Sequence, residues 1–133
     1  MSVNDPIADF LVVLKNASLV GKEEVVTPFS KFKLNILEVL KKEGFIENYT
    51  HDKNKKNNKD NNITVKLRYH EKQPIIKDAK RVSRVGRRVY MNKYSMPDRQ
   101  GNRVWFVSTS KGIFTALECK EKGIGGEILC YFE

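Results

Sequence analysis

The chain has 133 residues, the size of one small domain or of two small lobes, which excludes a large multidomain enzyme. Hydrophobic residues make up 40% and aromatic residues 10%, a composition typical of chains that fold around a core. The net charge of +9 favours a polyanionic partner, either nucleic acid or an anionic membrane surface. The longest apolar run, residues 10–14, is too short to cross a bilayer, and no basic stretch indicates a secretion signal. We therefore expect a cytoplasmic protein that is not embedded in a membrane.

Two amphipathic helices with a brief strand between them are expected at the start of the chain. The first helix is indicated by apolar residues at helical spacing: Ile7, Phe10, Leu11 and Leu14. After a break at Gly21, the residues Val25 and Val26 indicate a short strand. The second helix begins after the cap residue Ser30 and runs to about Glu43.

A hairpin with one solvent-exposed face should follow. Residues 45–49 are β-forming, and apolar and polar side chains alternate with a period of two along residues 63–69. Residues 51–62 contain no apolar side chain, so burial cannot offset the entropy lost on ordering them, and we expect a mobile loop. The expected order in this region is helix, strand, helix, strand, strand.

The expected boundary between two lobes lies at Pro74. It separates an N-terminal α/β lobe, residues 1–73, from a C-terminal β-rich lobe, residues 74–133. Short strands are expected in the second lobe at residues 88–90, 104–108 and 128–132. Its one short helix follows a capping box made by Thr115 and Glu118. The predicted fold class is α+β, with two small lobes.

The first feature that points to function is the basic segment, residues 80–103. It contains eight basic residues against one acidic residue, so most of the excess charge lies there. On an extended backbone Val82 and Val89 would face a core, while guanidinium groups such as those of Arg87 and Arg88 would face outward. Planar guanidinium groups bind phosphate well, and each contact releases counterions. The alternative is a solvated basic surface, but this concentration of charge favours contact with nucleic acid.

The second feature is the hydroxyl turn, Ser108-Thr109-Ser110-Lys111-Gly112. It lies between an expected strand and the last helix. Hydroxyl groups can both donate and accept hydrogen bonds, Lys111 adds a charge, and Gly112 allows a close approach of the backbone to a ligand. Stretches of this kind are more often plain loops, so this turn indicates function only in combination with the segments around it.

The third feature is Gly123-Ile124-Gly125-Gly126-Glu127, directly before an apolar strand. It is not a phosphate-binding P-loop, because the Lys-Ser/Thr pair is missing. A helix stop and a tight turn explain the glycines taken alone. Glu127 would repel phosphate, so we expect it either to accept hydrogen bonds from base amino or 2′-hydroxyl groups or to orient a nearby Lys or Arg.

No catalytic residue, metal ligand or cofactor is predicted. His51 and His70 have no sequence-local carboxylate and nucleophile, and Cys119 and Cys130 lack metal-ligand spacing. Two further hypotheses stay open from the residues alone. One is an RNA-modifying or RNA-cleaving enzyme that uses Ser108 or Lys111, although no general base is evident. The other is a nonspecific binder of nucleic acid or anionic membranes that acts by charge alone.

Segments spread over the whole chain resemble one family, the eighth ribosomal protein of the bacterial small subunit. They are AspProIleAlaAsp at 5–9, LysAsnAla at 15–17, ProPheSerLysPheLys at 28–33, LysLysGluGlyPheIle at 41–46, ArgValSer and GlyArgArgValTyr within 81–90, SerThrSerLysGly at 108–112 and GlyGlyGluIleLeuCysTyr at 125–131. The SerThrSerLysGly segment and the closing GlyGlyGlu are the most specific part of the resemblance.

The resemblance implies a two-lobe α+β protein without catalytic activity that binds the central domain of small-subunit ribosomal RNA directly and helps to assemble it. Its implied partners also include neighbouring small-subunit ribosomal proteins and its own messenger RNA. The RNA contacts that it implies are Ser108, Thr109, Ser110 and Lys111 lining the site, Tyr90 and Glu127 flanking it, Gly125 and Gly126 forming its floor, and Lys31 and Lys33 touching RNA backbone from the other lobe.

The chemistry of these residues agrees with that expectation. An A-form helix hides its bases in a deep, narrow groove, so proteins recognise it through its shape, phosphates, 2′-hydroxyl groups and distorted loops. Short hydroxyl side chains reach such groups at close range, and the basic segment would supply the salt-sensitive part of the affinity. Tyr90 could stack on an unpaired base or a sugar.

Overall fold

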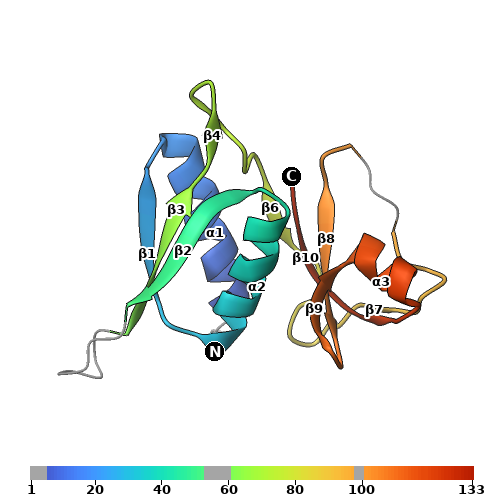
Figure 1. Cartoon of the computed structure of the whole chain (residues 1–133). Coiled ribbons are helices and arrows are strands. Elements are labelled where there is room, and N and C mark those ends of the chain that lie inside the picture. Colours follow the sequence, from blue (N-terminus) through green and yellow to red (C-terminus); the bar gives the residue numbers. More distant parts are fainter. Residues whose placement is uncertain (1–5, 53–60, 98–100) are drawn as a thin grey trace. The chain divides into compact units, whose positions relative to one another are not determined.

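The computed structural model describes residues 6–52, 61–97 and 101–133 (Figure 1). The chain divides into two compact units, and each is described by itself. The N-terminal unit comprises residues 12–77, and the C-terminal unit comprises residues 1–11 with 78–133. The lobe boundary expected at residues 73 and 74 stays a prediction. Within the described ranges, no helix has both the length and the apolar character needed to cross a membrane.

The elements of the first half are α1 (Pro6–Val20), β1 (Glu24–Pro28), α2 (Lys31–Lys42), β2 (Ile46–Asp52), β3 (Asn62–Leu67), β4 (Tyr69–His70) and β5 (Gln73–Pro74). Apart from the added short pair β4 and β5, this is the predicted order of helix, strand, helix, strand and strand. The three longer strands form an antiparallel sheet in the order β1-β3-β2. Figure 1 shows this sheet with α2 alongside it.

Local signals set the ends of both helices. Gly21 has a φ of +87°, a conformation that glycine adopts without strain, and it ends α1 as predicted. α2 follows the cap residue Ser30 and ends before Glu43, also as predicted. Its buried face consists of Ile36, Leu37, Val39 and Leu40, and Phe32 in its first turn is half-buried.

The predicted hairpin is confirmed, and it is longer at its tip than expected. Ile63 and Val65 are buried whereas Lys66 is exposed, which is the expected alternation. His51 pairs with Ile63 and its ring stacks on Phe29 at 4.1 Å between ring centroids. The expectation that the loop begins at residue 51 is therefore wrong, because this packing extends the strands. Residues 53–60, the centre of the expected mobile loop, lie outside the described part of the chain.

The C-terminal unit is mainly β, as predicted, with one short helix. Its elements after the first half are β6 (Ala79–Arg81), β7 (Tyr90–Met91), β8 (Val104–Thr109), β9 (Gly112–Thr115), α3 (Ala116–Lys122) and β10 (Gly126–Phe132). The sheet has the order β6-β10-β8-β9, and β7 also pairs with β10. The sequence missed β6 and β9 and placed a strand at residues 88–90, where the structure has only Tyr90–Met91. These strands are short. β6 and β7 are stabilised by pairing with the distant strand β10, and β9 pairs with the neighbouring strand β8.

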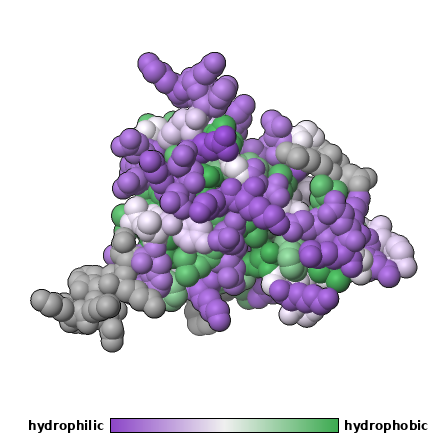
Figure 2. Space-filling model, in the orientation of Figure 1, coloured by the Kyte–Doolittle hydropathy of each residue, from purple (hydrophilic) through white to green (hydrophobic). Residues whose placement is uncertain are grey.

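The capping box and a buried cluster fix α3 on the sheet. The Thr115 hydroxyl accepts from the Glu118 N–H, and Gly123 ends the helix in the left-handed conformation, as predicted. The core beneath consists of Met96, Val107, Ala116, Cys119 and Ile128, with Val82 and Val89 packed partly buried against it. The predicted inward orientation of these two valines is thereby confirmed. Polar side chains cover much of the face seen in Figure 2.

Candidate RNA interface

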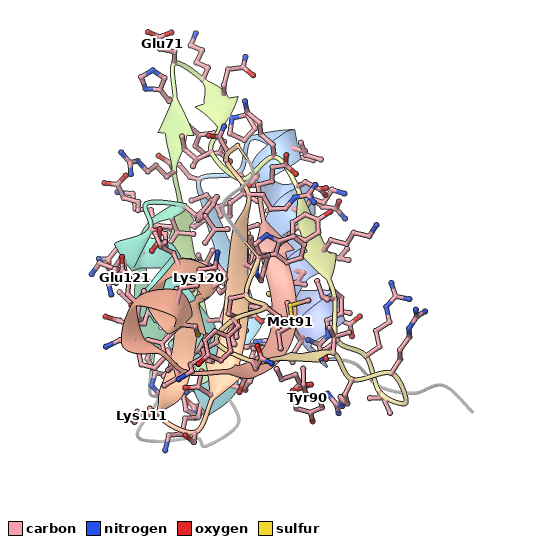
Figure 3. The ribbon with its side chains drawn as sticks, turned by 90° about the vertical axis from the view of Figure 1, so that its right-hand side faces the viewer. Glu71, Tyr90, Met91, Lys111, Lys120 and Glu121 are labelled. Atoms are coloured by element: carbon pink, nitrogen blue, oxygen red, sulfur yellow. The ribbon has the colours of Figure 1, made fainter. Side chains whose placement is uncertain are left out.

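The central strand β10 brings distant polar residues into one row. Glu127 pairs with Tyr90 of β7 on one side and with Ser108 of β8 on the other. Directly opposed residues of a sheet project from the same face, so these three side chains are neighbours on one surface. Tyr90 is 70% exposed. In Figure 3 it lies at the same end of the unit as Lys111.

The hydroxyl turn is the tip of a β-hairpin. Thr109 pairs with Gly112, so Ser110 and Lys111 form a two-residue connection between β8 and β9. The turn lies between a strand and the last helix, as expected, but the strand β9, which the sequence did not indicate, separates it from that helix. Gly112 has a φ of +126°, which favours glycine and explains its place in the turn.

Within this hairpin the hydroxyl groups differ in what they can do. The Thr109 Oγ1 donates to the carbonyl of Gly112 at 2.8 Å and accepts from the N–H of Lys111 at 3.1 Å. It therefore closes the turn. Ser110 and Lys111 are exposed and Ser108 is half-buried, and none of these three side chains has a hydrogen-bond partner among the described residues. They are the groups of the turn that can meet a ligand.

Gly125 and Gly126 are required by the close approach of neighbouring strands. A Cβ atom on Gly125 would lie 2.7 Å from the carbonyl oxygen of Met91, and one on Gly126 would clash with the carbonyl oxygen of Ser108 and lie 2.9 Å from Val107 Cγ1. No other residue fits without moving backbone. The two glycines therefore let β7 and β8 close on β10 beneath the polar row.

Within the basic segment, residues 84–87 form a tight turn instead of the extended backbone that we expected, whereas Lys80 and Arg81 in β6 and Tyr90 and Met91 in β7 are extended. Arg84 and Arg87 exchange backbone hydrogen bonds at 3.1 and 2.9 Å, and Gly86 has a φ of +83°. Arg84, Arg87 and Arg88 are exposed. Arg81 differs from them, because its guanidinium group is buried and donates to the carbonyl of Leu129 at 2.8 Å.

The carboxylate of Glu127 is bound by a buried serine and itself binds Arg88. Its Oε2 accepts from Ser83 Oγ at 2.9 Å and from Arg88 Nη1 at 3.2 Å. Ser83 is fully buried, and its Oγ also accepts from the N–H of Val89 at 2.8 Å. Of the two roles expected for Glu127, the structure shows the orientation of an Arg. Ser83 was missed as a functional residue, although it belongs to a segment that carries the family resemblance.

Lys31 and Lys33 belong to the N-terminal unit, at the start of α2. Lys31 is exposed. Lys33 Nζ donates to Thr27 Oγ1 at 3.0 Å and to the carbonyl of Pro28 at 3.3 Å. Part of the hydrogen-bonding capacity of Lys33 is therefore used within its own unit.

Taken together, these groups can recognise an anionic, hydroxyl-bearing polymer. The surface supplies hydroxyl donors and acceptors, an exposed aromatic ring and oriented cations. Across residues 6–52, 61–97 and 101–133 no group of three or more His, Cys, Asp or Glu side chains could hold a metal ion. The fold and this surface define a small basic α+β protein with a candidate RNA-binding face in its C-terminal unit.

Comparison with known proteins gives the family. Residues 5–132 match the family model described as ribosomal protein S8. The chain is 48% identical over 132 residues to the small ribosomal subunit protein uS8 of Xylella fastidiosa strain M23, 46% over 133 residues to that of Hydrogenovibrio crunogenus and 41% over 131 residues to that of Cereibacter sphaeroides strain ATCC 17029, covering 98% of both chains in each case. The chain therefore belongs to the ribosomal protein S8 family, whose members are structural ribosomal proteins and not enzymes. This confirms the resemblance that the sequence showed.

Proposed function

We propose that the chain is a structural component of the small ribosomal subunit that binds ribosomal RNA of the central domain directly and helps to assemble it. The family and its near full-length relatives support the ribosomal role, which makes the chain part of the cytoplasmic ribosome. Direct binding of the RNA, the region of the RNA and the residues in contact are the finer parts of the proposal.

The observation that carries the proposal is the row formed by Tyr90, Glu127 and Ser108. Three segments far apart in the sequence each contribute to it, and two of them continue into exposed cationic turns, which contain Arg87 and Lys111 respectively. A surface that combines short hydroxyl groups with oriented cations suits an irregular RNA helix, because 2′-hydroxyl groups, phosphates and unstacked bases are accessible there.

The roles proposed for the residues differ. Ser108, Ser110 and Lys111 would contact RNA directly, while Thr109 would shape the turn that presents them. Tyr90 would stack on an exposed base or sugar, and Gly125 and Gly126 would provide the floor on which the RNA rests. Arg87, Arg88, Lys31 and Lys33 would meet phosphates, and Glu127 would hold Arg88 in place.

Other ribosomal proteins of the small subunit are further proposed partners, in keeping with the names of the relatives. A messenger RNA that imitates the ribosomal site is not part of the proposal, since no observation on this chain favours it. Charge alone is the rival explanation of RNA binding, because a chain of net charge +9 attracts any nucleic acid.

A titration separates these two explanations. The purified chain is titrated with a short central-domain fragment of small-subunit ribosomal RNA and with an unrelated duplex RNA of equal length, at two salt concentrations. Specific recognition predicts a preference for the fragment that persists at the higher salt concentration. Equal binding to both RNAs, lost together as salt is raised, would show that only charge is at work.

A further inference from the structure

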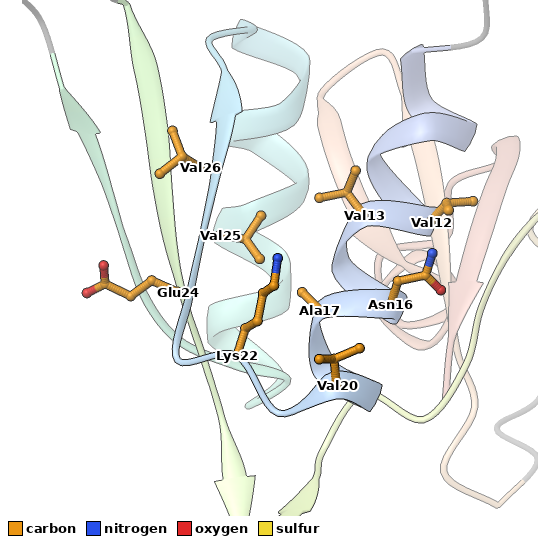
Figure 4. Close-up of a pocket in the computed structure, with 9 residues that line it drawn as sticks. All are labelled: Val12, Val13, Asn16, Ala17, Val20, Lys22, Glu24, Val25 and Val26. Atoms are coloured by element: carbon orange, nitrogen blue, oxygen red, sulfur yellow. The ribbon is translucent and has the colours of Figure 1, made fainter.

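A groove lies between α1 and β1, within the N-terminal unit and separate from the proposed RNA-binding row (Figure 4). Its volume is about 390 Å³. It is lined by Val12, Val13, Asn16, Ala17, Val20, Lys22, Glu24, Val25 and Val26. Val20 is 75% exposed and Val26 is 62% exposed, so apolar side chains at the groove are left in contact with solvent, which is a common feature of interaction sites.

One wall of the groove is the free edge of a β-sheet. β1 is an edge strand, because in the order β1-β3-β2 it pairs with β3 and with no other strand in the described part of the chain. The N–H of Leu67 donates to the carbonyl of Glu23, and the register continues with Val25 opposite Val65. Since the direction of the backbone groups alternates along an antiparallel strand, the N–H and C=O groups of Glu24 and Val26 point away from β3.

This free edge is short. Pro28 has no N–H, and its carbonyl accepts from Lys33 Nζ at 3.3 Å. Proline and lysine at an edge strand prevent further pairing. The outward-facing groups of Glu24 and Val26 therefore offer pairing to a short extended segment only.

The lining of the groove is apolar and carries no net charge. Six of its nine residues are Val or Ala, and the charged ones are Lys22 and Glu24, with opposite signs. The chain as a whole has a charge of +9. Because RNA is bound through an excess of basic groups, this neutral surface suits an uncharged segment of protein instead.

We propose that the groove binds an extended segment of another protein, with small aliphatic side chains at alternate positions, which pairs with β1 as an added strand. The backbone of the segment bonds to Glu24 and Val26, and every second side chain fills the space against Val13 and Val20 of α1. Strand addition beside a helix is an established mode of peptide recognition. α1 forms the opposite wall of the groove, so the added strand would lie between β1 and this helix.

Amide hydrogen exchange of the full chain tests the pairing residue by residue. In the free protein the amides of Glu24 and Val26 should exchange fast and those of Val25 and Thr27 slowly, because only the latter two donate to β3. The probe is an end-blocked peptide of alternating Val and Thr. Its addition should slow exchange at Glu24 and Val26 about tenfold or more and leave Val25 and Thr27 unchanged.

Two pairs of variants separate the backbone from the side-chain part of the site. Val26→Pro removes one outward N–H without touching the ladder to β3 and should weaken peptide binding about tenfold, whereas Val26→Thr keeps the N–H and should bind as before. Val20→Lys places a charge at the groove and should also weaken binding. Leu19→Lys, at an exposed α1 position that does not line the groove, should not.

Three results would overturn the proposal. The first is unchanged exchange at Glu24 and Val26 at the solubility limit of the peptide, or slowing that does not alternate along β1. The second is protection of Val26 in the free protein that increases with protein concentration, which would identify a second copy as the occupant. The third is protection by ribosomal RNA and not by peptide. The peptide experiments contain no RNA, and the effect of RNA is measured in a separate experiment. A negative result for the peptide would therefore leave the proposed RNA binding unaffected.

Discussion

The two ends of β10 each carry an Arg–Glu ion pair, and the two pairs are built in opposite ways. At the start of the strand Arg88 and Glu127 are joined at 3.2 Å, with side chains 44% and 16% exposed. Here the carboxylate is the fixed partner, because Ser83 also binds it. Among the described residues Arg88 has no further hydrogen-bond or ion-pair partner, and it lies in a turn of exposed arginines, so its remaining donors are open to solvent.

At the end of the strand the cation is the fixed partner. Arg103 and Glu133 are also joined at 3.2 Å, but the guanidinium group of Arg103 lies 4.1 Å from the ring centroid of Tyr131 and 5.6 Å from that of Trp105. Within the described residues, Arg103 Nε and Trp105 Nε1 are buried without a hydrogen-bond partner. This pair covers aromatic side chains, and the Arg103 side chain is 29% exposed, against 44% for Arg88.

The difference shows that an ion pair by itself indicates neither stability nor function. Partly exposed pairs contribute little to stability, about 0–1 kcal/mol. What matters is which partner the rest of the fold anchors. An anchored carboxylate presents its arginine to a polyanion, whereas an arginine stacked on aromatic rings adds to packing.

The largest expected effect comes from Gly126, where the functional end of β10 meets β8. Gly126→Ala should lower the free energy of unfolding by about 3 kcal/mol, because the added methyl group meets backbone that cannot move aside cheaply. Gly101→Ala is the control near the other end: it has a φ of +61° but open space around a Cβ atom, so its cost should be about 1 kcal/mol. Urea denaturation measures both, and equal costs would contradict the tight closure of β8 on β10.

The next effect concerns RNA binding alone. Ser110→Ala and Lys111→Ala should each weaken binding of the central-domain fragment by about 1–3 kcal/mol and leave the urea midpoint unchanged, because both side chains are exposed at the hairpin tip. Lys77→Ala removes an exposed lysine of the N-terminal unit and serves as the charge-matched control. Unchanged affinity in both turn variants would remove the hairpin from the proposed site.

Much of the fold was predictable because its signals are local. Helix ends at Gly21 and Gly123, the capping box at Thr115 and the alternation along β3 depend on neighbours in the sequence. The missed strands β6 and β9 depend on pairing with β10 and β8, and their own residues carry too weak a pattern to indicate them.

The candidate site also has a part that was predictable from local sequence and a part that was not. The hydroxyl turn, the glycine pair and the basic segment were recognised from residue types, and their assignment to RNA stays a prediction. Their arrangement was not predictable, since Ser83 and Glu127 meet across 44 positions. Burial of Arg81 was missed because an alternating pattern does not tell which of several arginines reaches a carbonyl inside the fold.

The two ion pairs make a direct test of the comparison. Arg88→Ala should weaken binding of the RNA fragment about tenfold with little change in stability, since Ser83 still holds Glu127. Arg103→Ala should lower the free energy of unfolding by about 1 kcal/mol, through loss of its contacts with Tyr131 and Trp105, and leave RNA affinity unchanged. Titration with RNA measures the affinity of each variant, and urea denaturation measures its stability. The comparison of the two ion pairs would be contradicted if Arg103→Ala weakened RNA binding as much as Arg88→Ala, or if Arg88→Ala cost as much stability as Arg103→Ala.

The smallest and most specific effect is on salt dependence. If Arg87 and Arg88 each neutralise one phosphate, each substitution to Ala should reduce the slope of log affinity against log salt by about 0.7–0.9. Arg103→Ala removes the same formal charge from the same chain but should leave that slope unchanged, because its guanidinium group lies over aromatic rings. An equal loss of slope in all three variants would mean that the RNA senses only net charge. A loss confined to Arg87 and Arg88 would locate the phosphate contacts at the start of β10.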